Sequence, residues 1–324
     1  MTLDPQVARV LQAADHSGLP PLETLSPEAA RAQYEKGSAM VGGRAPQLFS
    51  VRDIAVAGPR GDIGLRVYTP RDPAGEAMPL LIYIHGGGYV IGSLDSHDIP
   101  CRHLALNGDC MVISVDYRLA PEYPYPGPLE DCWAAVNAIV DQAEALGVCR
   151  DRIAIGGDSA GGNLATVTCL KARAEGGPDF IYQMLIYPGT DRTRSQPSHN
   201  ELADGYRLTR SLLDWFMNHY FEGAPADPND PYSSPLHADD LSGLPPALVV
   251  SAGYDPLRDE DIAYYEKLRA HGNAAEHLHY PGMIHGFINM PGVVDTARDC
   301  LEACGTRLRQ VFAERDMRQP PLSP

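Results

Sequence analysis

Apolar residues along this chain form short continuous runs that alternate with stretches of helical periodicity. The runs predict strands, at residues 47–57, 61–69, 78–85, 111–117, 153–155, 182–187, 246–252 and 275–280. The periodic stretches predict helices at 129–146, from 163 onward, at 259–271 and at 295–315. Strands that are apolar on both faces and alternate with helices are typical of a mainly parallel sheet covered on both sides. The first two strands, joined by G-P-R-G, predict an antiparallel hairpin at one edge.

Two segments depart from this alternation. Residues 3–16 have helical spacing, and Ser26-Pro27 is a typical start of a second helix, so 1–45 is expected to form cap helices. The segment 190–238 has no predicted strand and one helix near 208–221, which predicts a cap insertion. The catalytic core is then 46–189 together with 239–316, under a helical cap at the carboxyl edge of the sheet. A flexible tail is expected at 317–324.

Composition narrows the class of protein. With 324 residues, 44% of them hydrophobic, the chain can bury one large core or two modest ones. Its net charge of −16, without a run of Lys or Arg, argues against nucleic acid and against anionic membranes. No signal peptide and no apolar run near the ~20 residues of a membrane helix are visible. The seven cysteines are scattered without C-x-x-C spacing, so a reduced, cytoplasmic protein is expected.

The candidate chemistry centres on a glycine-rich turn, G-G-D-S-A-G-G at 156–162, between a predicted strand and a predicted helix. Glycines two positions before and after Ser159 relieve the crowding of so tight a turn. The pattern is that of a nucleophile elbow, which exposes a serine hydroxyl. A phosphate cradle, or a serine that only caps the helix, are alternatives for the turn taken alone.

A serine nucleophile needs a base and an acid that orients it, following in the order acid, histidine. Of the eleven histidines, His285 lies in the loop after the last strand, where an imidazole can reach over the sheet edge. Asp255 follows the preceding strand, although it could also cap the next helix. His277 and His279 alternate within a strand and could bind a metal, but no third ligand is evident.

The oxyanion of an acyl-transfer intermediate needs backbone N–H donors. His85 is followed by three glycines at the end of the third strand, where such donors belong, and Ala160 supplies another N–H beside the serine. A flexible glycine turn is the alternative. The order of these motifs along the chain favours the catalytic interpretation.

Together the motifs resemble the bacterial hormone-sensitive-lipase-like esterases. The resemblance rests on H-G-G-G-Y at 85–89, D-Y-R-L-A-P-E at 116–122, G-D-S-A-G-G-N at 157–163, D-P-L-R-D-E at 255–260 and H-G-F at 285–287. It implies an α/β-hydrolase fold that hydrolyses carboxylic esters with short acyl chains, without a metal or cofactor. It also implies Ser159, Asp255 and His285 as catalytic residues, with the N–H groups of Gly87, Gly88 and Ala160 as oxyanion donors.

The substrate pocket and the activity leave alternatives open. Five aromatic residues could line the pocket or simply pack in the core and cap: Tyr89, Tyr187, Tyr206, Trp215 and Phe287. The same machinery could cleave amides or N-formyl groups, or deacetylate a natural product. A non-catalytic receptor for a small ligand is a further alternative, although the receptor that resembles this family lacks the histidine present here. A homodimer through the last strand and the closing helix is implied by family likeness alone.

Overall fold

A single sheet of eight strands forms the centre of the fold. The structure is a computed structural model and describes residues 2–224 and 226–318. The strand order is β1-β2-β4-β3-β5-β6-β7-β8. The strands are β1 (Ser50–Gly58), β2 (Gly61–Thr69), β3 (Met78–Ile84), β4 (Met111–Asp116), β5 (Val148–Asp158), β6 (Tyr182–Ile186), β7 (Ala247–Tyr254) and β8 (Ala275–Ile284). Each of the eight predicted strands is therefore present.

The directions of the strands determine which strand ends meet at the candidate site. β1 and β2 form the predicted antiparallel hairpin, and β2 also pairs antiparallel with β4. From β4 through β3, β5, β6 and β7 to β8 every pairing is parallel. The carboxyl ends of these parallel strands meet at one edge, where ligands of open α/β sheets bind.

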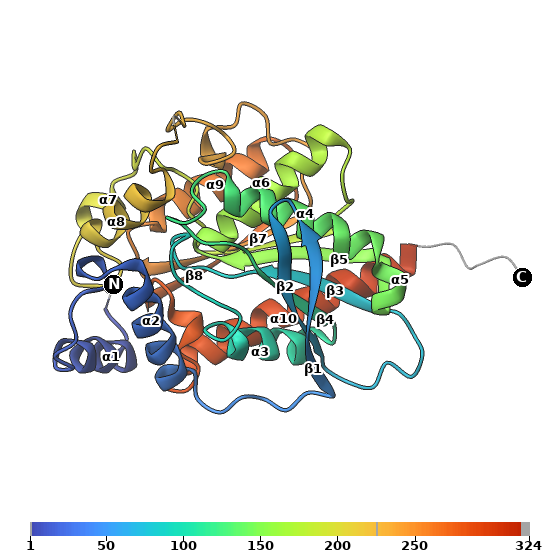
Figure 1. Ribbon diagram of the computed structural model, residues 1–324, viewed down its shortest axis with the longest axis horizontal. Helices are drawn as coiled ribbons and strands as arrows, with labels where there is room; N and C mark the ends of the chain where they lie inside the picture. Colours follow the sequence, from blue (N-terminus) through green and yellow to red (C-terminus); the bar gives the residue numbers. More distant parts are fainter. Residues whose placement is uncertain (1, 225, 319–324) are drawn as a thin grey trace, which may run out of the picture.

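Helices cover both faces of the sheet (Figure 1). On one face lie α4 (Gly127–Asp141), α5 (Ala143–Leu146), α6 (Ala160–Glu175) and α9 (Arg258–Ala270); on the other lie α3 (Asp98–Gly108) and α10 (Asp295–Arg318). The helix predicted at 129–146 is two helices that break at Gln142. Helix α3 was not predicted. The predicted tail at 317–324 falls largely outside the described residues, and α10 extends to Arg318.

The two non-core segments gather at one end of the molecule, on the left of Figure 1. The elements that gather there are α1 (Pro5–Asp15), η1 (Leu22–Thr24), α2 (Pro27–Gly42), α7 (Ser198–Glu201) and α8 (Arg210–Tyr220). The short helix η2 (Pro235–His237), at the end of the second segment, contacts α6 and α9 instead. Helix α2 starts as the sequence predicts: Ser26 accepts a hydrogen bond from a backbone N–H of its first turn, which Pro27 begins.

Arg31 of α2 joins this cap to the core. Its guanidinium donates to the carbonyl oxygens of Val90 and Ala120, each at 2.8 Å, and to the carboxylate of Glu122. Val90 follows the glycine loop at the end of β3, so one side chain ties the cap helix to the loops beside the sheet edge. Glu122, the last residue of the D-Y-R-L-A-P-E motif, is thus part of the contact between cap and core.

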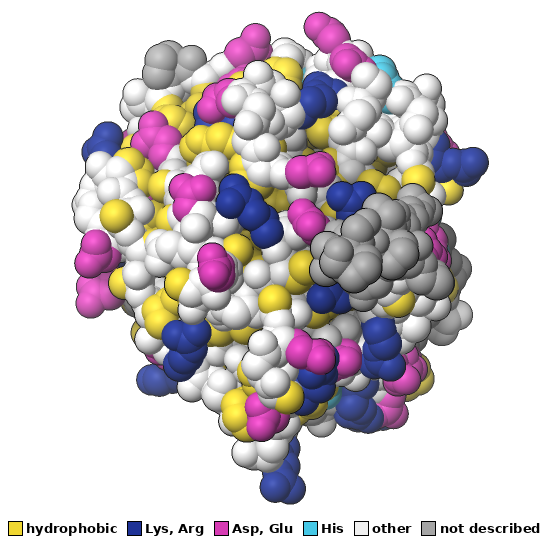
Figure 2. Space-filling view, turned by 90° about the vertical axis from the view of Figure 1, so that its right-hand side faces the viewer, with side chains coloured by type: hydrophobic (Ala, Val, Ile, Leu, Met, Phe, Trp, Pro, Cys, Tyr) yellow, Lys and Arg dark blue, Asp and Glu magenta, His cyan; other side chains and the backbone are white. Residues whose placement is uncertain are grey.

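The remaining composition-based expectations concern cysteines and surface charge. All seven cysteines are free thiols, and six of them are buried, as expected of small core side chains. Figure 2 shows the end of the molecule away from the cap, where acidic and basic side chains are interspersed and Lys and Arg form no single patch. Within the described part of the chain, no helix is long and apolar enough to cross a membrane.

Candidate active site

Ser159 sits on a strained corner between β5 and α6. Its φ is 55° and ψ is −121°, a left-handed backbone conformation that a residue with a side chain rarely adopts. Its N–H donates to the carbonyl of Ile186 at 2.9 Å, which holds the corner in place. The flanking glycines are required by packing, because a Cβ at Gly157 or Gly161 would lie 2.3 or 2.0 Å from the carbonyl oxygen of Ile84. The turn is therefore built to present one serine, as the glycine pattern predicts.

Three side chains far apart in the sequence form one hydrogen-bonded chain at this corner. The Oγ of Ser159 lies 2.8 Å from Nε2 of His285, and Nδ1 of His285 lies 2.7 Å from Oδ2 of Asp255. Asp255 directly follows β7 and His285 directly follows β8, so the parallel strands deliver both to the same edge as Ser159. Asp255 is fully buried and His285 is 9% exposed, which shields the pair from water.

Asp255 also fulfils the alternative role considered for it. Its Oδ1 accepts a hydrogen bond from the backbone N–H of Leu257 at 2.9 Å, at the start of α9. The two carboxylate oxygens therefore serve different partners, and the backbone contact fixes the carboxylate that orients His285.

The glycine loop after β3 lies beside the serine. Gly87 and Gly88 have φ values of 123° and 58°, which glycine adopts without strain. A Cβ on Gly87 would lie 2.1 Å from the carbonyl oxygen of Ile91, and one on Gly88 would meet the ring of Phe216. Within the described residues, the N–H groups of Gly87 and Gly88 have no hydrogen-bond acceptor. Both glycines line the cavity that holds Ser159, Ala160 and His285.

Asp158 links this loop to the elbow, a role that the sequence analysis missed. Its Oδ1 accepts hydrogen bonds from the N–H of Gly86 at 3.0 Å and the hydroxyl of Tyr83 at 2.8 Å. Nε2 of His97 lies 3.4 Å away. Burial alone would raise the pKa of this carboxyl, but His97 and the hydrogen-bond donors lower it. The ionised carboxylate next to Ser159 thus positions the start of the glycine loop. An acidic residue directly before the serine was the available signal.

His85, the first residue of that loop, is a neutral structural group. It is fully buried, its ring stacks on Tyr117 at 4.4 Å, and His97 lies 5.4 Å away. Burial and the neighbouring His97 lower its pKa to about 3. His85 is therefore uncharged at neutral pH and contributes no positive charge to the site.

A cavity of about 1050 Å³ opens over Ser159 between the core and the cap. Of the five aromatic residues considered for the pocket, Tyr89 lines this cavity. The other four make packing contacts instead: Tyr187 against His285 and Phe287, Tyr206 against Tyr254, and Trp215 against Phe216 and His219. Cap side chains that the sequence did not single out line it, including Leu208, Leu212, Phe216 and Met217. For those four aromatic residues the packing alternative is the one observed.

His277 and His279 are also explained by packing. Both rings lie on β8 and hydrogen-bond to Oγ of Ser251, at 2.7 and 2.9 Å. Burial, together with the charge of neighbouring groups, lowers the pKa of both imidazoles. In the described portion of the chain, no group of three or more His, Cys, Asp or Glu side chains is arranged to hold a metal ion.

Comparison with known proteins gives concordant matches. A family described by the α/β-hydrolase fold matches residues 81–289. The carboxylic ester hydrolase LipN of Mycobacterium tuberculosis is 45% identical over 251 residues, which are 76% of this chain and 66% of LipN. An ethyl acetate hydrolase of Pseudomonas putida is 38% identical over 318 residues, 96% of this chain and 99% of that relative.

A solved structure has a closely similar fold. The ester-hydrolase EH1AB1 from the metagenome of Lake Arreo, complexed with a derivative of bipyridine phosphonate, superimposes with a TM-score of 0.93 at 41% identity. The match covers 96% of this chain and 100% of that one.

Proposed function

This chain belongs to the α/β-hydrolase fold family, and we propose that it hydrolyses carboxylic esters with short acyl chains through an acyl-serine intermediate. The predicted fold and the resemblance to esterases are confirmed by the family match and by relatives that are carboxylic ester hydrolases. The single observation that carries the mechanism is the unbroken chain of hydrogen bonds from Ser159 through His285 to Asp255.

In the first half-reaction, Oγ of Ser159 attacks the ester carbonyl carbon while Nε2 of His285 takes its proton. Asp255 holds Nδ1 and stabilises the imidazolium that forms. The negative oxygen of the tetrahedral intermediate is stabilised by the N–H groups of Gly87, Gly88 and Ala160, each worth about 3 kcal/mol when aligned. The intermediate collapses, His285 returns the proton to the leaving alcohol, and the acyl group remains on the serine.

In the second half-reaction the same groups act on water. His285 takes a proton from a water molecule, whose oxygen attacks the acyl carbon. The tetrahedral intermediate then collapses, the bond from the acyl carbon to Oγ of Ser159 breaks, His285 returns the proton to Oγ, and the carboxylic acid is released. No step requires a metal or cofactor, because the chain supplies nucleophile, base and oxyanion donors.

The preference for short acyl chains is supported by the cap. Phe216 of α8 lines the cavity and lies against Gly88, so its ring occupies space beside the glycine loop. The measurement is kcat/KM on p-nitrophenyl esters of graded acyl length, which we expect to peak at short chains and fall steeply before palmitate. Efficient turnover of the palmitoyl ester would contradict this.

Ser159→Ala tests the nucleophile, because it removes one oxygen and leaves the fold intact. Loss of p-nitrophenyl butyrate hydrolysis with unchanged thermal unfolding is expected. Comparing kcat/KM on a matched ester and amide distinguishes ester from amide cleavage, and a fluorophosphonate probe distinguishes an enzyme from a non-catalytic receptor. The 2.8 Å contact between Ser159 and His285 favours labelling.

A homodimer completes the proposal. β8 is the last strand of the sheet, so its outer edge has no partner strand among the described residues, and α10 packs nearby. We expect a dimer in size-exclusion chromatography with light scattering, and a monomer at all concentrations would refute it.

A further inference from the structure

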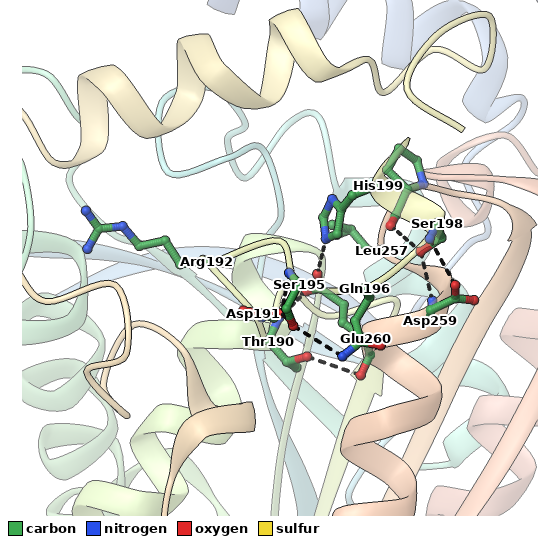
Figure 3. Close-up of polar contacts among 12 residues, drawn as sticks. Thr190, Asp191, Arg192, Ser195, Gln196, Ser198, His199, Leu257, Asp259 and Glu260 are labelled. Atoms are coloured by element: carbon green, nitrogen blue, oxygen red, sulfur yellow. Dashed lines mark hydrogen bonds and ion pairs between the residues drawn. The ribbon is translucent and has the colours of Figure 1, made fainter. Parts of the chain in front are cut away.

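A second polar pair faces the cavity and takes no part in the proposed mechanism. His199, on the short helix α7 of the cap insertion, and Glu260, on α9 of the core, both line the cavity that contains Ser159. They are 3% and 1% exposed. Figure 3 shows the imidazole of His199 directly above the carboxylate of Glu260, with Leu257 beside it.

Hydrogen bonds hold the carboxylate of Glu260 on every side. Oε2 of Glu260 lies 2.6 Å from Nε2 of His199, and Oε1 accepts from the backbone N–H groups of Thr190 at 2.5 Å and Asp191 at 3.1 Å. Three donors converging on one carboxyl group are what an ionised carboxylate binds. Nε2 of His199 is therefore the ring nitrogen that serves Glu260, and Nδ1 is the ring nitrogen left without a role in the pair.

Nδ1 of His199 is buried without a protein partner. Nδ1 of His199 has no hydrogen-bond partner in the described part of the chain, although it is shielded from solvent. A buried polar atom without a partner is destabilising by the cost of its lost hydration, so native proteins rarely keep one. Because His199 lines the cavity, a hydroxyl group of a bound ligand, which can donate or accept, would give this nitrogen the partner it lacks.

The ring is held rigidly, as a binding group must be. The neighbouring residue Ser198 donates from its N–H to Oδ2 of Asp259 at 2.9 Å, and its Oγ accepts from the N–H of Asp259 at 3.2 Å. The same Oγ donates to the carbonyl of Pro256 at 2.7 Å. These contacts, of which the two between Ser198 and Asp259 are visible in Figure 3, hold α7 against the start of α9, so the position of His199 is set by both elements.

We propose that Nδ1 of His199 binds a hydroxyl group of the substrate, so that the enzyme prefers carboxylic esters that carry a hydroxyl group in addition to the scissile ester. A hydroxyl suits this wall because it is neutral and can either donate or accept, and because the apolar side chain of Leu257 lies beside the imidazole. The inference rests on the proposed esterase function and narrows its substrate class.

The hydroxyl could lie on the acyl or on the alcohol side of the ester, and two substrate pairs separate these sources. Ethyl 3-hydroxybutyrate against ethyl 3-methylbutyrate exchanges hydroxyl for methyl on the acyl side. 2-Hydroxyethyl butyrate against propyl butyrate does so on the alcohol side. The wild-type enzyme is expected to have about tenfold higher kcat/KM, measured by pH-stat titration, for the hydroxylated member of one pair, as one hydrogen bond of ordinary strength provides.

The variant His199→Phe keeps a planar ring and removes both nitrogens. It should abolish the preference, so that within this variant kcat/KM for the hydroxylated ester equals kcat/KM for its methyl-bearing partner. His199→Gln keeps a hydrogen-bond donor toward Glu260, so it replaces His199→Phe in the test if the Phe variant does not fold. It should retain part of the preference. The matched control is His219→Phe on α8, whose ring packs against Trp215 and does not line the cavity, and it should leave the preference unchanged.

The outcomes are decisive in each direction. Equal kcat/KM within both pairs for the wild type, or an unchanged preference in both His199 variants, would refute the inference and leave the proposed function standing. Failure of the wild type to hydrolyse any of the four esters, with no labelling of Ser159, would refute the proposed function and this inference with it.

Discussion

Replacing Asp158 by alanine should damage both the stability and the activity of this enzyme, through the glycine loop. In the native structure one buried oxygen, Oδ1, accepts hydrogen bonds from the N–H of Gly86 and the hydroxyl of Tyr83. Alanine leaves both donors buried without an acceptor. Each such donor costs about 1–3 kcal/mol, so we expect the free energy of unfolding to fall by about 2–6 kcal/mol.

The substitution should lower kcat because Gly86 directly precedes the proposed oxyanion donors. The next two residues, Gly87 and Gly88, are the proposed oxyanion donors, and misplacing a single donor lowers kcat by about 10²–10³-fold. Because Asp158 shifts the loop and does not remove it, a loss near the lower end, about 10²-fold in kcat, is expected. KM should change much less, since the cap side chains that line the cavity are untouched.

The assay combines urea unfolding followed by circular dichroism with kcat and KM on p-nitrophenyl butyrate. Asp158→Asn is the matched control, because its carboxamide oxygen can accept from both donors and should restore most of the stability and of kcat. An Asp158→Ala protein within twofold of wild-type kcat would refute the positioning role. So would an Asn variant as impaired in kcat as the Ala variant.

Three further outcomes are expected elsewhere. Arg31→Ala removes the hydrogen bonds that hold α2 to the core loops and should lower the free energy of unfolding by about 1–2 kcal/mol and speed tryptic cleavage of the cap; unchanged cleavage would refute that role. Gly161→Ala should prevent folding because its Cβ would lie 2.0 Å from a backbone oxygen, whereas Gly189→Ala, with nothing within 4 Å, should fold and serve as its control. Burial raises the pKa of Asp191, but hydrogen bonds from three neighbouring side chains outweigh it and lower the pKa to about 2. Because the pKa of this carboxyl in the unfolded chain is about 3.9, its ionised form stabilises the fold fully above about pH 4, and this stabilisation is lost as the pH falls toward 2. Urea titrations at several pH values should show that the difference between wild type and Asp191→Asn shrinks over that window, and a constant difference would contradict this.

The strands and the serine turn could be predicted because each has a local sequence pattern. The apolar runs gave the strands, and the glycines around Ser159 gave the elbow, because tight packing against Ile84 admits no other residue there. His285 and Asp255 could be placed because parallel strands carry the residues that follow them to one edge. These are consequences of short-range geometry, which a single sequence records.

Contacts between distant segments were not predictable in this way. Helix α3 was missed because its apolar residues do not form a regular stripe and a proline, Pro100, lies in its first turn. The links from Arg31 to the core loops and from His199 to Glu260 join residues at least 59 positions apart, and neither side of such a pair looks unusual alone. The prediction of pocket-lining residues failed for the same reason. Trp215 and Phe216 are adjacent aromatic residues on one helix, and only Phe216 lines the cavity.

The measurement that tests the central claim most directly is rapid-quench mass spectrometry of the protein during turnover of p-nitrophenyl butyrate. We predict that one butyryl group accumulates on the peptide that contains Ser159 and disappears when substrate is exhausted. Turnover of the ester with no acylated Ser159 at any time, or with the butyryl group on another residue, would contradict the account.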